Sequence, residues 1–274
     1  MEVQISLTVN ESKRLIAKAI VRMPEVEAAF DNGKIVLKGG TTVSAICEEL
    51  VGSPLRISGR ITEKGTLTAK NRDEKLPHSA LIENKTRINI DTTISKIVEG
   101  LDREDVIIIS GNAMDINGNV AMMAGAPGGG TPGRAVTGML TQGAHVIIPM
   151  GLEKLIPGSI REAVQAAGRE KDLSHGMAVG LIPLFGKVVT EKDAVEILAP
   201  VNCTVIGKGG IHGGDGSTVM VVKGEKEPVE TIWELVEKIK GAKISGEPSS
   251  LEACDGPSEQ CSRHRACIYK QGKK

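Results

Sequence analysis

The chain has 274 residues, of which 40% are hydrophobic and 25% charged, with 34 basic and 34 acidic side chains. This balance excludes a disordered chain, and it excludes a net charge that would draw the protein to nucleic acid or to a membrane surface. With only two Phe, one Trp and one Tyr, the chain lacks aromatic platforms for base stacking, so we expect no nucleic-acid partner.

No apolar run reaches the ~18 residues that a membrane span needs. No positively charged, apolar leader follows Met1. We therefore expect a soluble, cytoplasmic protein with no membrane partner. The five cysteines fit a chain that keeps its thiols reduced.

The first elements form a compact anion-binding pattern. Residues 8–30 are predicted to be helical, with Asn10 as the cap, and Pro24 either ends or kinks this helix before a second short helix over 26–30. A strand over 34–37, a glycine turn and a helix over 43–51 follow, and a helix N-terminus after such a turn binds anions. The candidate ligand residues of this turn are Gly39, Gly40, Thr41 and Thr42. The alternative is an ordinary turn in which Thr41 or Thr42 only caps the helix.

Residues 55–61 alternate apolar and polar side chains, which predicts a strand with Arg56, Ser58 and Arg60 on one face. Arg60 is a candidate for phosphate or carboxylate binding. A solvated face paired with nearby acids is the alternative. Residues 63–83 are polar and predict a surface excursion, followed by a strand over 87–90 and a helix over 92–101.

The central segment is a fully apolar strand, residues 106–109, followed by a loop rich in glycine and short amides over 110–134. Such a loop lets the backbone approach a ligand and leaves N–H groups free to bind oxygen atoms. Its candidate ligand residues are Asn112, Asn117, Asn119, Gly128, Gly129, Gly130 and Thr131. Asp115 is the candidate for acid–base work, because it alone among these loop residues can take a proton in that role. It could equally hold its own turn.

The remaining elements alternate. Helices are predicted over 135–142, 159–167, from Thr190 onward and over 229–239, and strands over 145–149, 179–185, 201–206 and 218–222. The glycine loop 207–217 offers a titratable set, Lys208, His212 and Asp215. It could be a β-hairpin or lid, a crossover, or a flexible surface hairpin. Strands alternating with helices predict a mostly parallel open sheet with helices on both faces, Rossmann-like in arrangement.

Three motifs carry a family resemblance. GNAMDINGNV, followed by GGGTPGRAV and GAHVIIPMGLEK, resembles stretches of coenzyme A transferase subunits, and KIVLKGGTTVSAICEEL resembles the first loop of sugar-phosphate-sensing regulators. The chain thus resembles the ribose-5-phosphate isomerase, glucosamine-6-phosphate deaminase and coenzyme A transferase-like superfamily. The resemblance covers residues 30 to about 155 and implies a coenzyme A transferase-like α/β domain over 1–245.

The chain also departs from that superfamily. The acid-rich motif and the lysine of the isomerases are replaced by Ser110-Gly111-Asn112-Ala113 and Ala124. The nucleophilic glutamate of the transferases has no counterpart in its usual setting. Glu153 is the nearest substitute by position, and its alternative role is a carboxylate that the helix dipole favours. Asp115 and Glu153 are therefore the catalytic candidates.

Residues 246–274 form a basic tail with Cys254, Cys261, His264 and Cys267. Three thiols and one imidazole make a complete tetrahedral set for zinc or an iron–sulfur cluster, although their spacing matches no common pattern. The alternative is incidental thiols or one redox pair. Basic residues, including Lys273 and Lys274, would raise thiolate reactivity.

The sequence therefore predicts a protein that binds a small anionic ligand, phosphorylated or coenzyme A-linked, with coenzyme A as a candidate substrate. The enzyme hypothesis is a transferase or an isomerase. The alternatives are a non-catalytic ligand sensor on the same fold and a metal- or redox-responsive protein that acts through its tail cysteines. A homo-oligomer is compatible with each of these.

Overall fold

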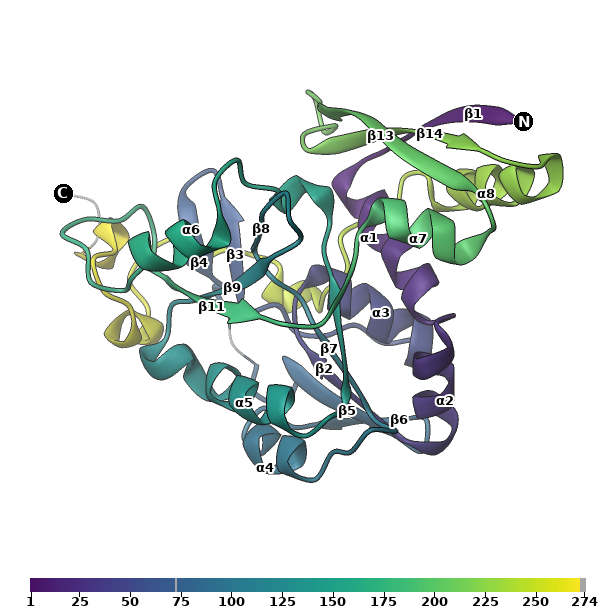
Figure 1. Cartoon of the computed structure of the whole chain (residues 1–274). Helices are drawn as coiled ribbons and strands as arrows, with labels where there is room; N and C mark the ends of the chain where they lie inside the picture. Colours follow the sequence, from purple (N-terminus) through teal and green to yellow (C-terminus); the bar gives the residue numbers. More distant parts are fainter. Residues whose placement is uncertain (72, 272–274) are drawn as a thin grey trace.

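The computed structural model of the protein describes residues 1–71 and 73–271, so Lys273 and Lys274 of the predicted basic tail lie outside the described residues. Its centre is a six-stranded sheet with strand order β12-β10-β7-β2-β5-β6 (Figure 1). The strands are β2 (Lys34–Lys38), β5 (Ser79–Glu83), β6 (Thr86–Asn89), β7 (Val106–Ile109), β10 (His145–Pro149) and β12 (Lys187–Val189).

This sheet is mixed, so the prediction of a mostly parallel sheet is wrong. The β12–β10, β10–β7 and β7–β2 pairs are parallel, whereas β2–β5 and β5–β6 are antiparallel. Of the two antiparallel strands, β5 lies in the segment expected to be a surface excursion, whereas β6 overlaps the strand predicted over 87–90. The β5 strand is short and buried, and it pairs directly with β2 along all five residues. Only three of its residues, Ala80, Leu81 and Ile82, are apolar, and three apolar residues within a polar segment give too weak a periodic signal to identify an interior strand.

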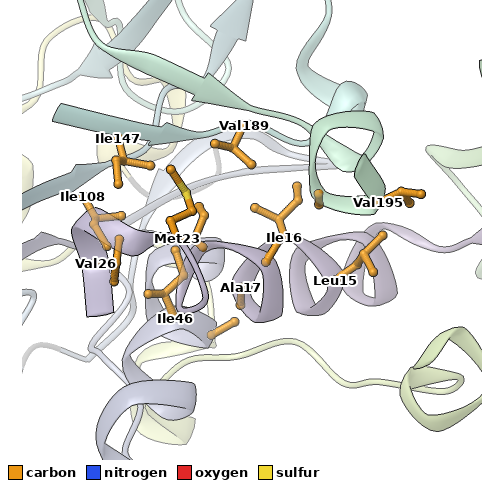
Figure 2. Close-up of a cluster of buried hydrophobic side chains, with 14 of the residues drawn as sticks. Leu15, Ile16, Ala17, Met23, Val26, Ile46, Ile108, Ile147, Val189 and Val195 are labelled. Atoms are coloured by element: carbon orange, nitrogen blue, oxygen red, sulfur yellow. The ribbon is translucent and has the colours of Figure 1, made fainter. Parts of the chain in front are cut away.

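Helices cover both faces of the central sheet. The alternation within β2 sends Ile35 and Leu37 to one face and Val36 to the other. Figure 2 shows the first of these cores, where Ile16, Met23 and other apolar side chains of the helices pack toward Ile108 and Ile147. The first face carries α1 (Val9–Ile20), α2 (Pro24–Asn32), α3 (Thr41–Val51) and α7 (Glu191–Leu198), and the second carries α4 (Ile94–Glu99) and α5 (Gly130–Thr141).

A second, antiparallel sheet of order β1-β14-β13 lies at one end of the molecule against α8 (Figure 1). Its elements are β1 (Glu2–Leu7), β13 (Asn202–Gly209), β14 (Ser217–Lys223) and α8 (Lys226–Ile239). The pairing of β13 with β14 makes the glycine loop between them a hairpin rather than a crossover. No pattern in the sequence predicts a strand before residue 8, yet β1 pairs with β14, which lies more than two hundred residues later in the chain.

Two smaller sheets complete the other end of the molecule. A three-stranded antiparallel sheet contains β8 (Ala113–Met114), β9 (Val120–Ala124) and β11 (Gly180–Leu184), and a hairpin contains β3 (Gly59–Thr62) and β4 (Gly65–Thr68). The helix α6 (Ile160–Ala166) packs nearby. The predicted strand over 55–61 therefore overlaps β3 only at its end. The loop predicted over 110–134 contains β8, β9 and the start of α5.

The C-terminal segment lies along the β3–β4 hairpin (Figure 1). The Cys254 nitrogen donates to the Thr68 oxygen at 2.9 Å, and the Ser174 nitrogen donates to the Ala266 oxygen at 2.9 Å. Short 3₁₀ helices at Pro248–Ser250, Glu259–Arg263 and Ile268–Gln271 provide its regular structure. The segment is thus hydrogen-bonded to the body of the protein over much of its length.

Candidate functional site

The four parallel strands of the central sheet end at one edge, and polar residues follow each of them. Lys38 ends β2, Ser110 follows β7, Glu153 and Lys154 follow β10, and Glu191 follows β12. Ligands bind at the carboxyl ends of strands in open α/β sheets. We call these five residues, together with Lys13 of α1, the carboxyl-edge site.

The turn between β2 and α3 is held by a close backbone approach. The Gly39 nitrogen donates to the His78 oxygen at 2.8 Å, and a Cβ at Gly39 would lie only 2.5 Å from the His78 Nδ1 atom. Glycine is therefore required at this position. A Cβ built on Gly40 would lie 3.9 Å from the Cβ of Ser110, so the predicted anion-binding turn does reach the carboxyl edge.

Neither Thr41 nor Thr42 caps α3, so the alternative of an ordinary turn with a threonine cap is wrong. The N-cap position is Gly40, and no side chain accepts a hydrogen bond there. The Thr42 hydroxyl is buried and has no hydrogen-bond partner in the described part of the chain. The first-turn N–H groups of α3 consequently lack a side-chain acceptor.

Three half-buried lysines, Lys13, Lys38 and Lys154, lie on the elements that form this edge. Burial lowers the pKa of Lys13 to about 8, although the charge of Glu153 opposes the shift. Burial alone lowers the pKa of Lys38 to about 8. Burial also lowers the pKa of Lys154, against the charges of Glu153 and Glu191. Among the described residues, neither Lys13 nor Lys38 has a carboxylate oxygen within ion-pair distance.

The two carboxylates of the site have different surroundings. Glu191 begins α7 and accepts hydrogen bonds from the Leu152 nitrogen at 2.9 and 3.2 Å, and burial raises its pKa. Glu153 folds back over the backbone of Gly151, where any Cβ would overlap its carboxylate. Its Oε2 atom is buried without a hydrogen-bond partner in the described residues. Glu153 therefore keeps one oxygen free beside Lys13 and Lys154.

The β13–β14 hairpin borders the site through its base. A Cβ at Gly216 would lie 3.4 Å from the Cβ of Glu153. Lys208 donates to the Thr218 hydroxyl at 2.9 Å and contributes a charge near Glu191. His212 and Asp215 lie exposed in the loop beyond. Of the three residues predicted for this loop, the structure brings only Lys208 to the carboxyl edge.

The Asp115 carboxylate holds its own turn, which is the alternative to acid–base work that the sequence left open. Its carboxylate accepts hydrogen bonds from the Asn117 and Asn119 nitrogens, from the Asn119 side chain and from the Ile160 nitrogen, at 2.9–3.1 Å. The Asn119 side chain, followed by the Ile160 nitrogen, lowers the pKa of Asp115. A carboxylate held as an acceptor in this way is poorly suited to exchange protons near neutral pH.

The other residues of the amide-rich loop also serve local structure. Asn112 accepts a hydrogen bond from the Met123 nitrogen at 2.9 Å, and Asn117 and Asn119 are exposed residues of the Asp115 turn. Gly128, Gly129, Gly130 and Thr131 form the entry to α5. A Cβ at Gly129 would lie 3.0 Å from Ile182 of β11, which places this entry against the small sheet.

Arg60 binds the C-terminal segment rather than an open site. Its guanidinium donates to the carbonyl oxygens of Leu251, Ser250 and Ile57 at 2.5–3.1 Å. Arg60 therefore donates to backbone carbonyl oxygens, and it neither lines an open anion site nor pairs with acids on a solvated face. Arg60 fixes the segment that follows residue 246 onto the hairpin.

The tail cysteines are free thiols. Cys254 contacts the Gly256 oxygen at 3.0 Å, and Cys261 contacts Ser258. Within the described part of the chain, no three His, Cys, Asp or Glu side chains are placed to hold a metal ion. The structure thus does not bring Cys254, Cys261, His264 and Cys267 together as one ligand set.

Two surface hollows lie elsewhere. One of about 470 Å³ lies at the junction of α1, α3 and α8, and another of about 410 Å³ lies beside Met1 and Trp233. In the first, Arg14 and Lys18 are already paired with Glu48 and Glu49. These pairs already satisfy two of the cations that line the first hollow, and we take the carboxyl edge as the candidate site.

Sequence reasoning missed Lys13, Lys38, Ser110, Lys154 and Glu191 as candidates. A usable signal existed for Lys38 and Ser110, because each stands at the end of an apolar strand. No sequence signal marks Lys13, which reaches the site only because α1 packs against this edge.

No helix among the described residues is long and apolar enough to cross a membrane. No protein-family profile matches the chain, and no curated protein matches it.

Proposed function

We propose that the protein binds a small anionic ligand, phosphorylated or coenzyme A-linked, at the carboxyl-edge site. The observation that carries this proposal is that Lys13 and Lys38 are half-buried and have no carboxylate oxygen within ion-pair distance among the described residues. Enclosing an unpaired ammonium group costs free energy, which a bound anion would recover. The β2–α3 turn supplies backbone N–H groups beside Ser110 that suit phosphate or carboxylate oxygens.

The fold proposed for this function is the Rossmann-like, coenzyme A transferase-like arrangement that the motifs resemble. The mixed central sheet with helices on both faces supports the coarser part of that proposal. In its catalytic form, the protein is a transferase or an isomerase acting on the bound anion.

A non-catalytic sensor is the second candidate. The observation in its favour is Asp115, whose carboxylate is occupied by hydrogen bonds and whose pKa is lowered. A ligand that is bound but never converted would support the sensor.

Calorimetric titration with inorganic phosphate, ribose 5-phosphate and coenzyme A tests the binding proposal. We expect binding at pH 7 that weakens as the pH rises through about 8, because Lys13 and Lys38 then lose their charge. The Lys38→Met variant should bind at least about tenfold more weakly, which corresponds to about 1.4 kcal/mol. The exposed Lys96→Met change on α4 is the matched control and should leave the affinity unchanged. Equal affinities for all three proteins would contradict the proposal.

A further inference from the structure

The carboxyl-edge site contains a serine–lysine pair that anion binding alone does not use. The Nζ atom of Lys154 donates a hydrogen bond to the Oγ atom of Ser110 at 3.1 Å, and the Ser110 hydroxyl donates to the Pro149 oxygen at 2.9 Å. Ser110 is 8% exposed and follows β7 directly. A hydroxyl within hydrogen-bond reach of a nitrogen base is the arrangement that activates serine nucleophiles.

We propose that Ser110 is a nucleophile that accepts an acyl group from an anionic ester or thioester, with Lys154 as its general base. This inference rests on the proposed function, because the carboxyl-edge site would hold the anionic carrier of the acyl group.

The surroundings of Lys154 favour the free amine that a base requires. The Lys154 side chain is half-buried, and burial lowers its pKa below the ordinary lysine value. Glu153 and Glu191 oppose that shift, and their charges stabilise the ammonium ion once a proton has been accepted. The pair thus has a base and two nearby carboxylates whose charges act on that base.

The same edge provides a place for the charge that develops on the acyl oxygen. Gly40 faces Ser110 across the β2–α3 turn, and the first-turn N–H groups of α3 have no partner within the helix. Backbone N–H groups beside a serine nucleophile stabilise the oxyanion of a tetrahedral intermediate. The buried Thr42 hydroxyl, which lacks a partner among the described residues, lies in the same turn.

The proposed step balances without a further reactant. The Ser110 oxygen bonds to the acyl carbon while its proton passes to the Lys154 amine. The bond from the acyl carbon to the ester oxygen or thioester sulfur then breaks, and the Lys154 ammonium returns the proton to the departing alkoxide or thiolate. The product is O-acyl-Ser110, from which water or an acceptor hydroxyl takes the acyl group by the same route.

The test uses the full chain with p-nitrophenyl acetate as the ester probe and acetyl-coenzyme A as the thioester probe. After an acid quench, peptide mapping by mass spectrometry identifies the acetylated residue. We expect a burst of product equal to the protein concentration and acetylation at Ser110, which Ser110→Ala abolishes. The exposed Ser6→Ala change on β1 is the matched control and should keep the burst.

The Lys154→Arg variant tests whether Lys154 acts as a general base or only as a positive charge beside Ser110. Arginine keeps the charge and the donor but does not give up its proton in proteins, so acetylation should slow about a hundredfold or more. An acetylation rate equal to that of the unaltered protein would overturn the role of Lys154. Acetylation of a lysine in place of Ser110, or of no residue, would overturn the proposal in the unaltered chain, whatever the variants do.

The two proposals fail separately. Phosphate binding that persists without acetylation of Ser110 leaves the proposed function standing and removes the nucleophile. The reaction with p-nitrophenyl acetate needs no anionic group, so it reports on Ser110 even if no anion binds.

Discussion

The His78 imidazole packs directly on the backbone of Gly39, with Nδ1 2.5 Å from the position that a Gly39 Cβ would take. The same Nδ1 atom lies 3.0 Å from the Arg56 oxygen, and burial followed by the charge of Lys38 lowers the pKa of His78 to about 4. The His78 ring is therefore neutral near pH 7, and it packs against the β2–α3 turn near Lys38. The turn geometry that presents Gly40 to Ser110 depends on this contact.

Gly39→Ala should therefore destabilise the protein. The new methyl group would overlap the His78 backbone, which cannot move without disturbing the β2–β5 pairing. We expect a loss of about 1–3 kcal/mol in the free energy of unfolding, measured by urea denaturation. Gly180→Ala on β11 is the control, because a Cβ there meets nothing within 4 Å. Equal losses in both variants would contradict the close-contact explanation.

The lysine pKa values predict an unusual dependence of stability on pH. An unfolded lysine keeps its proton up to about 10.5, whereas folded Lys38 loses it near 8, so the unfolded state binds more protons between these values. The free energy of unfolding should thus rise from pH 8 to 10.5 in a buffer without small anions. Lys13 contributes in the same direction.

Lys38→Met should reduce that rise and stabilise the protein near pH 7 by about 1–3 kcal/mol. Chemical denaturation at a series of pH values measures both effects. Lys96→Met, on the exposed side of α4, should keep the full rise. A Lys38→Met curve parallel to that of the unaltered protein would show that this lysine is not enclosed in solution.

Asp115→Asn should lower the melting temperature. The amide that replaces the carboxylate would turn an NH₂ group toward N–H donors, including the Asn119 and Ile160 nitrogens. Because the pKa of Asp115 is lowered, its contribution is present above the unfolded value of 3.8 and is lost as the pH falls through the folded value. Calorimetry at neutral pH should show no comparable effect for exposed Asp172→Asn.

Ser250→Ala should loosen the C-terminal segment. The Ser250 hydroxyl accepts a hydrogen bond from the buried Ile57 nitrogen at 2.9 Å and donates to the Glu247 oxygen at 2.7 Å. Leaving the Ile57 N–H without a partner costs about 1–3 kcal/mol. Limited proteolysis should then cut the segment after residue 246 faster. The neighbouring Ser249, which is exposed, provides the control, and Ser249→Ala should be cut at the original rate.

The sequence by itself determined the strands that carry the site and the turn that follows the first of them. The apolar runs at β7 and β10 can only be buried, and Gly39-Gly40 after β2 marks a close approach of backbone. The apolar runs and the glycine pair are local features of the sequence, so they can be recognised without knowledge of the fold. The predicted anion-binding turn therefore lies at the edge where the parallel strands end.

Only the tertiary structure decided which side chains share that edge. Periodicity does not reveal that β5 enters the central sheet antiparallel, or that β1 pairs with a strand more than two hundred residues away. Lys13, Lys38 and Lys154 read as ordinary polar residues in sequence, since the pKa of a lysine depends on the atoms that enclose it. Those atoms come from α1, β2 and the turn after β10, which meet only when the chain has folded.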